Sequence, residues 1–152
     1  MKTKVLLSAF FIISLNQLTA QSLRYSLAQP YSSLSAYSVQ QNDALSFTGN
    51  QAALALTKQA GIGIFGERRF MLKETSVYTL GAAVPTRLGN IGIQLQYAGF
   101  KNFRENKIGL AYARKLGKLV DVGVQFNYYG YSIPAYGKAS AINFEMGALF
   151  HL

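Results

Sequence analysis

The 152-residue chain contains no cysteine, one histidine and only six acidic residues. The lack of cysteine excludes disulfide bonds, thiolate metal ligands and the acylated cysteine of a lipoprotein. The sequence also lacks a Gly-x-Ser-x-Gly motif, a His-Glu-x-x-His motif and a closely spaced pair of carboxylates. Because no acid, base or nucleophile constellation is visible, we expect neither an enzyme nor a bound cofactor or metal.

Long apolar runs are absent after residue 20, and the one before it has the form of an export signal. Lys2 and Lys4 precede an apolar run from Val5 to Leu15, and Ala20 follows at a suitable cleavage position. The run is shorter than the ~20 apolar residues of a spanning helix, so a retained anchor is the less favoured alternative. The sequence therefore predicts a signal peptide over 1–20 and export from the cytoplasm.

Basic residues outnumber acidic ones, with 15 Lys and Arg against six Asp and Glu. A strongly basic chain often binds nucleic acid. Here the basic residues do not lie along one helical face, and the predicted export separates the chain from cytoplasmic nucleic acid. We therefore expect no nucleic-acid partner.

From residue 60 onward, apolar and small or polar residues alternate with a period of two. The stretch AGIGIFGERRF carries Gly61, Gly63 and Gly66, which fit the Gly-x-Gly-x-x-Gly pattern of a dinucleotide-binding loop. That loop requires a helix after the glycines, whereas an arginine pair follows here, so we interpret the stretch as a strand. Alternation predicts five more strands, around residues 78–84, 91–99, 108–113, 120–130 and 142–150. The segments 91–97 and 122–128 match each other at an offset of 31 residues, as in a repeated hairpin.

Residues 21–59 show little alternation. Asn50 is a good N-cap for a short helix that ends at Leu56, because its side chain accepts a hydrogen bond from a free backbone amide. We expect loops and one or two helical turns in this N-terminal segment, which is a candidate plug for the predicted sheet.

The face opposite the apolar one is lined by small and uncharged polar residues, which suits the lumen of a membrane β-barrel. Short connections at 85–90 and 114–119 alternate with longer aromatic and basic ones, as in outer-membrane barrels. The sequence thus predicts an all-β, antiparallel, up-and-down transmembrane barrel over 60–152. A soluble exported β-domain is the alternative. The expected lumen-lining residues are Gln94, Gln96, Asp121, Gln125, Asn127, Asn143 and Glu145.

Asp121 and Glu145 are expected either to form a polar constriction with Gln94, Gln125, Asn127 and Asn143, or simply to hydrogen-bond each other and water in a plugged lumen. His151 is expected at a membrane boundary. Basic residues of the longer connections are candidates for binding the phosphates of lipopolysaccharide, or are ordinary solvated charges. These candidates are Arg68, Arg69, Lys73, Lys101, Arg104, Lys107 and Lys138.

Six strands are fewer than the 8 of the smallest single-chain barrels. We therefore expect an open sheet, either because the chain is the N-terminal fragment of a longer protein, which we favour, or because copies associate or a strand lies in 21–59.

The stretch NDALSFTGNQAALA, residues 42–55, together with the glycine-rich strand after it, resembles the start of barrels related to the fatty-acid transporter family, including outer-membrane components of the type IX secretion system. Those barrels carry an Asn-Pro-Ala-Gly-Leu-like motif, which Asn50, Ala52 and Leu54 match, while Gln51 and Ala53 replace its proline and glycine. The resemblance implies a barrel of more strands, with the N-terminal segment inside or beneath it.

Two functions follow as expectations for a protein of the outer membrane. The first is a transport barrel that passes a small hydrophobic molecule. The second is a non-transporting accessory or anchoring barrel that acts with protein partners, as in type IX secretion. The expected surroundings are outer-membrane lipid and lipopolysaccharide.

Overall fold

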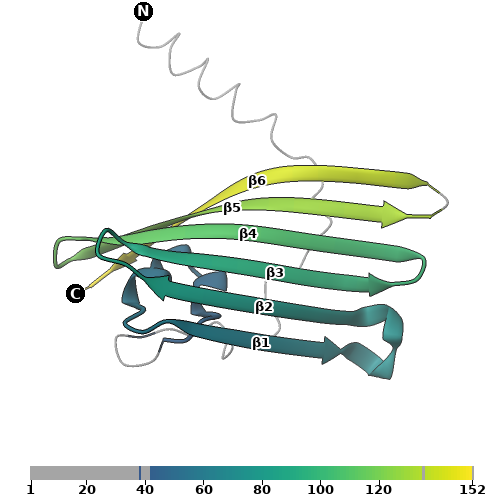
Figure 1. The fold of residues 1–152 in the computed structure, drawn as a ribbon, viewed down its shortest axis with the longest axis horizontal. Helices are drawn as coiled ribbons and strands as arrows, with labels where there is room; N and C mark the ends of the chain where they lie inside the picture. Colours follow the sequence, from purple (N-terminus) through teal and green to yellow (C-terminus); the bar gives the residue numbers. More distant parts are fainter. Residues whose placement is uncertain (1–37, 39–41, 135, 152) are drawn as a thin grey trace, which may run out of the picture.

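The computed structural model describes residues 38, 42–134 and 136–151. The predicted signal peptide and most of the segment 21–41 lie outside the described residues. The described chain forms one six-stranded antiparallel sheet in which every strand pairs with the next along the chain (Figure 1). The strands are β1 (Gly61–Arg68), β2 (Ser76–Pro85), β3 (Asn90–Phe100), β4 (Phe103–Leu116), β5 (Val120–Ile133) and β6 (Gly137–Phe150).

This topology confirms the predicted all-β, up-and-down architecture. The sheet is open, with β1 and β6 as its two edges among the described residues. The expectation that six strands do not close a barrel is therefore confirmed.

The glycine-rich stretch that imitates a phosphate-binding loop is strand β1. It pairs with β2 along its whole length, from Gly61 opposite Ala83 to Arg68 opposite Ser76. Ile62 and Ile64 are 74% and 79% exposed on one face, Gly61 and Gly63 lie on the other, and Gly66 shares the face of the isoleucines. The interpretation as a strand is therefore confirmed.

The two faces of the sheet differ in chemistry, as the alternation predicts. We call the face that contacts the N-terminal helical turns the inner face, and the opposite one the outer face. Along β3, for example, burial alternates between exposed Ile, Leu and Tyr on the outer face and buried Gly and Gln on the inner face. The outer face is therefore an exposed apolar surface, whereas the inner face is small and polar.

The prediction of long connections at one end is wrong for two of the three. Only Lys101 and Asn102 join β3 to β4, and only residues 134–136 join β5 to β6. The Tyr-rich and polar residues expected in loops extend the strands instead, with Tyr131 opposite Ala139, so that β4, β5 and β6 are each 14 residues long. Aromatic residues favour the extended backbone once a cross-strand neighbour is available. Only the β1–β2 connection, which contains η3 (Arg69–Met71) and η4 (Lys73–Thr75), is longer.

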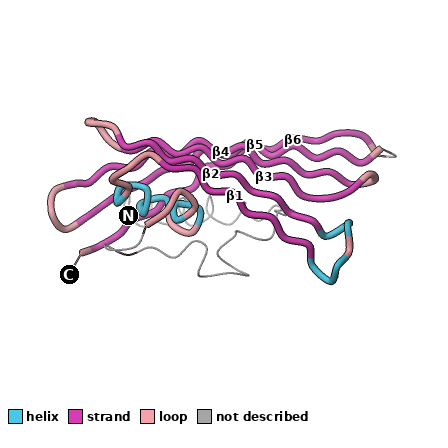
Figure 2. Tube along the Cα trace, turned by 60° about the horizontal axis from the view of Figure 1, so that its bottom comes forward, coloured by secondary structure: helices cyan, strands magenta, loops and turns pink. Residues whose placement is uncertain are grey.

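Two 3-10 helices, η1 (Ser46–Thr48) and η2 (Gln51–Leu56), lie against the inner face at the end with the β2–β3 and β4–β5 turns (Figure 2). We call residues 42–57 the plug. The predicted N-cap is confirmed, because the Asn50 side chain accepts a hydrogen bond from the Ala52 amide at 3.0 Å.

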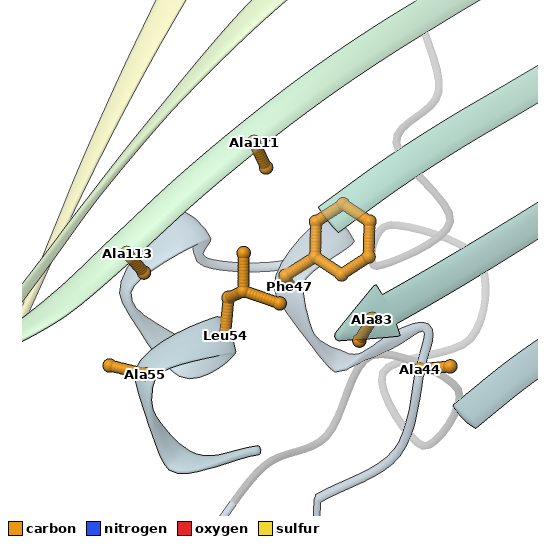
Figure 3. Close-up of a cluster of buried hydrophobic side chains, with 7 residues drawn as sticks. All are labelled: Ala44, Phe47, Leu54, Ala55, Ala83, Ala111 and Ala113. Carbon is orange, nitrogen blue, oxygen red and sulfur yellow. The ribbon is translucent and has the colours of Figure 1, made fainter. Parts of the chain in front are cut away.

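The hydrophobic core lies between the plug and the sheet (Figure 3). Phe47 and Leu54 are its large side chains, and the sheet contributes only Ala83, Ala111 and Ala113. Small wall residues let the helical backbone approach the strands closely, so the core is thin and depends on the fit of the plug.

Candidate functional site: the plug and the polar inner face

Glycines of five strands form the seat of the plug. A Cβ atom at Gly81 would lie 2.7 Å from the Ala44 carbonyl oxygen, and one at Gly147 would lie 3.0 Å from the Gln51 amide nitrogen. A Cβ at Gly123 would overlap the backbone of Gln51 and its neighbour. The seat consists of Gly63, Gly81, Gly92, Gly123 and Gly147. The inner face is therefore glycine-rich because plug backbone, at Gly81, Gly123 and Gly147, or plug side chains, at Gly63 and Gly92, occupy the space of the missing side chains.

Asparagine side chains fasten the plug to the sheet and to itself. Asn90 of β3 donates from Nδ2 to the carbonyl oxygens of Leu54 at 2.7 Å and Thr57 at 2.9 Å. These are carbonyls at the end of η2, where the helix leaves its last acceptors without internal partners. Asn50 donates to the Ala148 carbonyl of β6 at 3.1 Å. The plug thus bridges β3 and β6.

Sequence reasoning missed the role of Asn90. Its only signal was an asparagine at the start of a strand, directly after the turn residue Gly89. Nothing local indicates that a helix end 33 residues earlier would lie beside it.

Four of the predicted lumen residues form a continuous chain of hydrogen bonds, which we call the amide ladder. Gln125 donates from Nε2 to Gln94 Oε1 at 2.9 Å and to Asn127 Oδ1 at 2.6 Å. Asn127 in turn donates to Asn143 Oδ1 at 2.9 Å. Gln125 is 1% exposed and Asn127 is fully buried, so the ladder is part of the folded wall.

The bond between Gln94 and Gln125 crosses over strand β4 at Gly109. A Cβ atom at Gly109 would lie 2.5 Å from Gln125 Nε2. The two glutamines occupy equivalent positions of the 31-residue repeat. The repeat therefore places the same amide on the inner face of two strands that run in the same direction. Gln125 lies two positions along β5 from Asn127, the residue that is level with Gln94 across Gly109.

Glu145 joins the plug to the wall. Gln51 of the plug donates from Nε2 to Glu145 Oε2 at 2.8 Å, and the Lys107 ammonium lies 3.8 Å from Glu145 Oε1. The same ammonium lies 5.7 Å from the centre of the Tyr129 ring. A cation, a carboxylate and an aromatic ring thus meet beside the end of the plug.

This placement corrects the prediction for Lys107 as a surface-lipid ligand. Lys107 alternates with the outward-facing Ile108 on β4, so its side chain lies on the inner face and pairs with Glu145. The signal was in the sequence, because positions 108, 110 and 112 already define the outer face and leave 107 on the other.

Asp121 and Glu145 do not form one constriction. Asp121 is opposite Leu149 in the register, whereas Glu145 is opposite Gln125. Four residues along a strand correspond to ~13 Å. Asp121 is instead 2.8 Å from Nε2 of His151, at the end of the sheet with the β2–β3 and β4–β5 turns.

The remaining predicted residues are spread over the wall. Gln96 is buried on the inner face, in register with Lys107. Arg68 and Arg104 are exposed on the outer face, and Lys73 and Lys101 are exposed in the β1–β2 connection and the β3–β4 turn. The side chain of Arg69 lies outside the described residues.

Within residues 42–134 and 136–151 no group of three or more His, Cys, Asp or Glu is placed to hold a metal ion. None of the helices in the described part of the chain is long and apolar enough to cross a membrane. Comparison of the chain with protein-family models, curated proteins and solved structures gives no match.

Proposed function

We propose that the chain forms the wall of an outer-membrane β-barrel whose lumen holds the plug. The observation that carries the proposal is the outer face, where large apolar side chains stay exposed along all six strands. Soluble monomers rarely leave a continuous apolar surface of this extent in water. Lipid is a solvent that accepts this face, and strands β2 to β5, which pair on both sides, satisfy the backbone hydrogen bonds that hydrocarbon cannot.

The same feature argues against the soluble exported β-domain. In such a domain the apolar face is the core and needs a covering layer. Here the only covering elements among the described residues, η1 and η2, lie on the inner, polar face.

The proposed activity is gated passage of a small molecule through the lumen. The plug occupies the inner face at one end of the sheet, so a solute passes there only when the plug leaves its seat. The resemblance of residues 42–55 to the fatty-acid transporter family favours a small hydrophobic cargo.

A reversible covalent lock tests this activity. The Ala44 Cβ lies 3.8 Å from the Cβ position at Gly61. That separation is typical of disulfides, and the chain has no other cysteine to compete. In the variant Ala44→Cys/Gly61→Cys, oxidation forms a disulfide between the start of the plug and β1. The disulfide prevents the plug from leaving the inner face, which it could otherwise do by movement of the connection that follows Thr57.

The assay is uptake of a medium-chain fatty acid by proteoliposomes, with disulfide formation checked by intact mass. We expect slower uptake in the oxidised than in the reduced variant, and no response of the parent protein to the oxidant. Equal rates in the two redox states would reject gating by the plug, and uptake equal to that of empty liposomes would reject transport.

One observation favours the accessory barrel as a second candidate. Phe70 and Met71 at the tip of the β1–β2 connection are 88% and 86% exposed. Both adopt positive φ values, 53° and 59°, which non-glycine residues rarely do. An exposed apolar tip on a strained backbone is typical of a contact site for another protein.

The test is crosslinking in whole cells through a photoreactive residue at Lys73, beside this tip. A reproducible partner that is captured by the parent and lost in Phe70→Ser/Met71→Ser supports the accessory function. Capture that is unchanged in the double variant would rule out this tip as the contact.

A further inference from the structure

The outer face carries a hollow of about 870 Å³ toward the end of the sheet that holds the β1–β2 connection. Most of its lining comes from outward-facing positions of β4, β5 and β6 and from tyrosines of the strands beside them. The hollow exists because small residues, Gly130 and Ser140, stand in register with bulky Tyr97 and Tyr78 on the other side of β4.

Two cations stand in one row at the rim of this hollow. The register places Arg104 opposite Ser132 and Ser132 opposite Lys138. Adjacent strands are ~4.8 Å apart, so the backbones at Arg104 and Lys138 are ~10 Å apart with a small hydroxyl residue between them. Two long cationic side chains at this spacing can both reach one phosphate above the serine.

Polarity falls row by row from the cations toward the middle of the sheet. Below the cation row come Asn106, Gly130 and Ser140, which are small or polar. The next row contains Ile108 and Tyr128. The surface therefore changes from cations to small polar residues and then to apolar and aromatic side chains. A phospholipid has the matching order of groups: a phosphate head, a polar linker and an acyl chain.

The distribution of charge supports an anionic occupant. Of the six acidic residues, the four that lie on strands all face inward. They are Glu67, Glu105, Asp121 and Glu145. Within the described residues, neither Arg104 nor Lys138 takes part in an ion pair. These cations are therefore available to a ligand.

We propose that this hollow binds the phosphate-bearing head of an outer-leaflet lipid, with Arg104 and Lys138 on the phosphate and the acyl chain against Ile108 and Tyr128. The proposal rests on the proposed membrane location. It assigns a lipid rather than free phosphate, because free phosphate would leave the apolar part of the hollow unused.

The test is native mass spectrometry of the full chain in detergent with bis-phosphorylated lipid A, and with phosphatidylcholine as the net-neutral lipid. Arg104→Gln/Lys138→Gln removes both cations. Arg114→Gln is the matched control, because Arg114 is exposed on the same face of the same strand at the opposite end. Ser140→Phe fills the hollow without changing its charge.

We expect the double variant to bind lipid A at least about 10-fold more weakly, because it loses both charge-assisted contacts to the phosphate. Ser140→Phe should weaken binding as well, and Arg114→Gln should not. Parent-like binding by the double variant, or an equal loss in Arg114→Gln, would overturn the site.

Flotation of proteoliposomes separates this proposal from the membrane proposal. A chain that inserts and floats but does not prefer lipid A refutes the lipid site alone. A chain that remains in the soluble fraction refutes both, because the hollow then never meets lipid.

Discussion

Substitution of Gly123 by alanine should unseat the plug. The added Cβ would overlap backbone atoms of Gln51 and Ala52, and backbone atoms cannot rotate away as a side chain can. Gly123 lies on β5, whose ladder with β4 and β6 fixes its position. The overlap is therefore relieved by movement of the plug rather than of the strand.

The cost follows from what the seated plug buries. Phe47 and Leu54 are each 1% exposed, and full burial of such a side chain contributes about 1.5–3 kcal/mol. The hydrogen bond from Gln51 to the Glu145 carboxylate is also lost, at about 1.5–3 kcal/mol for a bond to a charged group. Because the plug shifts rather than detaches completely, we expect a loss of about 2–4 kcal/mol in the free energy of plug opening.

Hydrogen exchange of the plug amides measures this free energy. The Ala53 amide donates to the Asn50 carbonyl at 2.9 Å, and its exchange reports plug opening. A loss of about 2–4 kcal/mol accelerates exchange by more than about 10-fold. Gly130→Ala is the matched control on the same strand, because its Cβ would meet only the Tyr128 ring at 3.7 Å.

Parent-like exchange in Gly123→Ala would show that η2 does not sit on β5 in solution. Acceleration of the same size in Gly130→Ala would show that any alanine on β5 disturbs the plug, and the argument from close approach would be lost.

Three further outcomes follow from the inner face and the wall. Gly109→Ala should interrupt the amide ladder and lower the free energy of unfolding in detergent by about 1–3 kcal/mol, because a buried amide loses its partner; an unchanged urea midpoint would contradict the crossing at β4. Val124→Arg should lower the free energy of unfolding in bilayers by about 2–4 kcal/mol if the outer face contacts lipid near the bilayer midplane, with Val124→Leu as the control. A near-neutral effect would indicate that water, not lipid, covers this face. A double-mutant cycle with Glu145→Gln and Lys107→Gln should give a coupling of about 1 kcal/mol in urea unfolding, and additive effects would show that the pair is not formed.

Much of the wall was predictable from sequence, because alternation with a period of two is a local property. The side chains of Ile91, Ile93 and Leu95 share a face wherever the strand lies in the molecule. The helix start at Asn50 was equally local, since the capping side chain and the Ala52 amide that donates to it are two residues apart. Six strands, their faces and the capped turn therefore followed from short stretches of chain.

Strand lengths and the glycine seat could not be predicted in this way. The stretch around Tyr131 has the composition of a loop, and it became strand because residues of β6 pair with it. The sequence around Gly81 and Gly123 indicates only that small residues lie on one face of each strand. Nothing in the adjacent residues shows that plug backbone fills the space above these glycines.

The chemistry of the site depends on contacts between residues far apart in the chain. Gln51 and Glu145 are separated by 94 positions, and Asp121 and His151 by 30. Sequence alone determined that Asp121 and Glu145 lie on the polar face of the sheet, because the face follows from the period of the strand. Only the tertiary structure decided which residues meet, because partners depend on the register of successive strands and on where the plug docks, and a shift of either would exchange every partner without altering the local pattern.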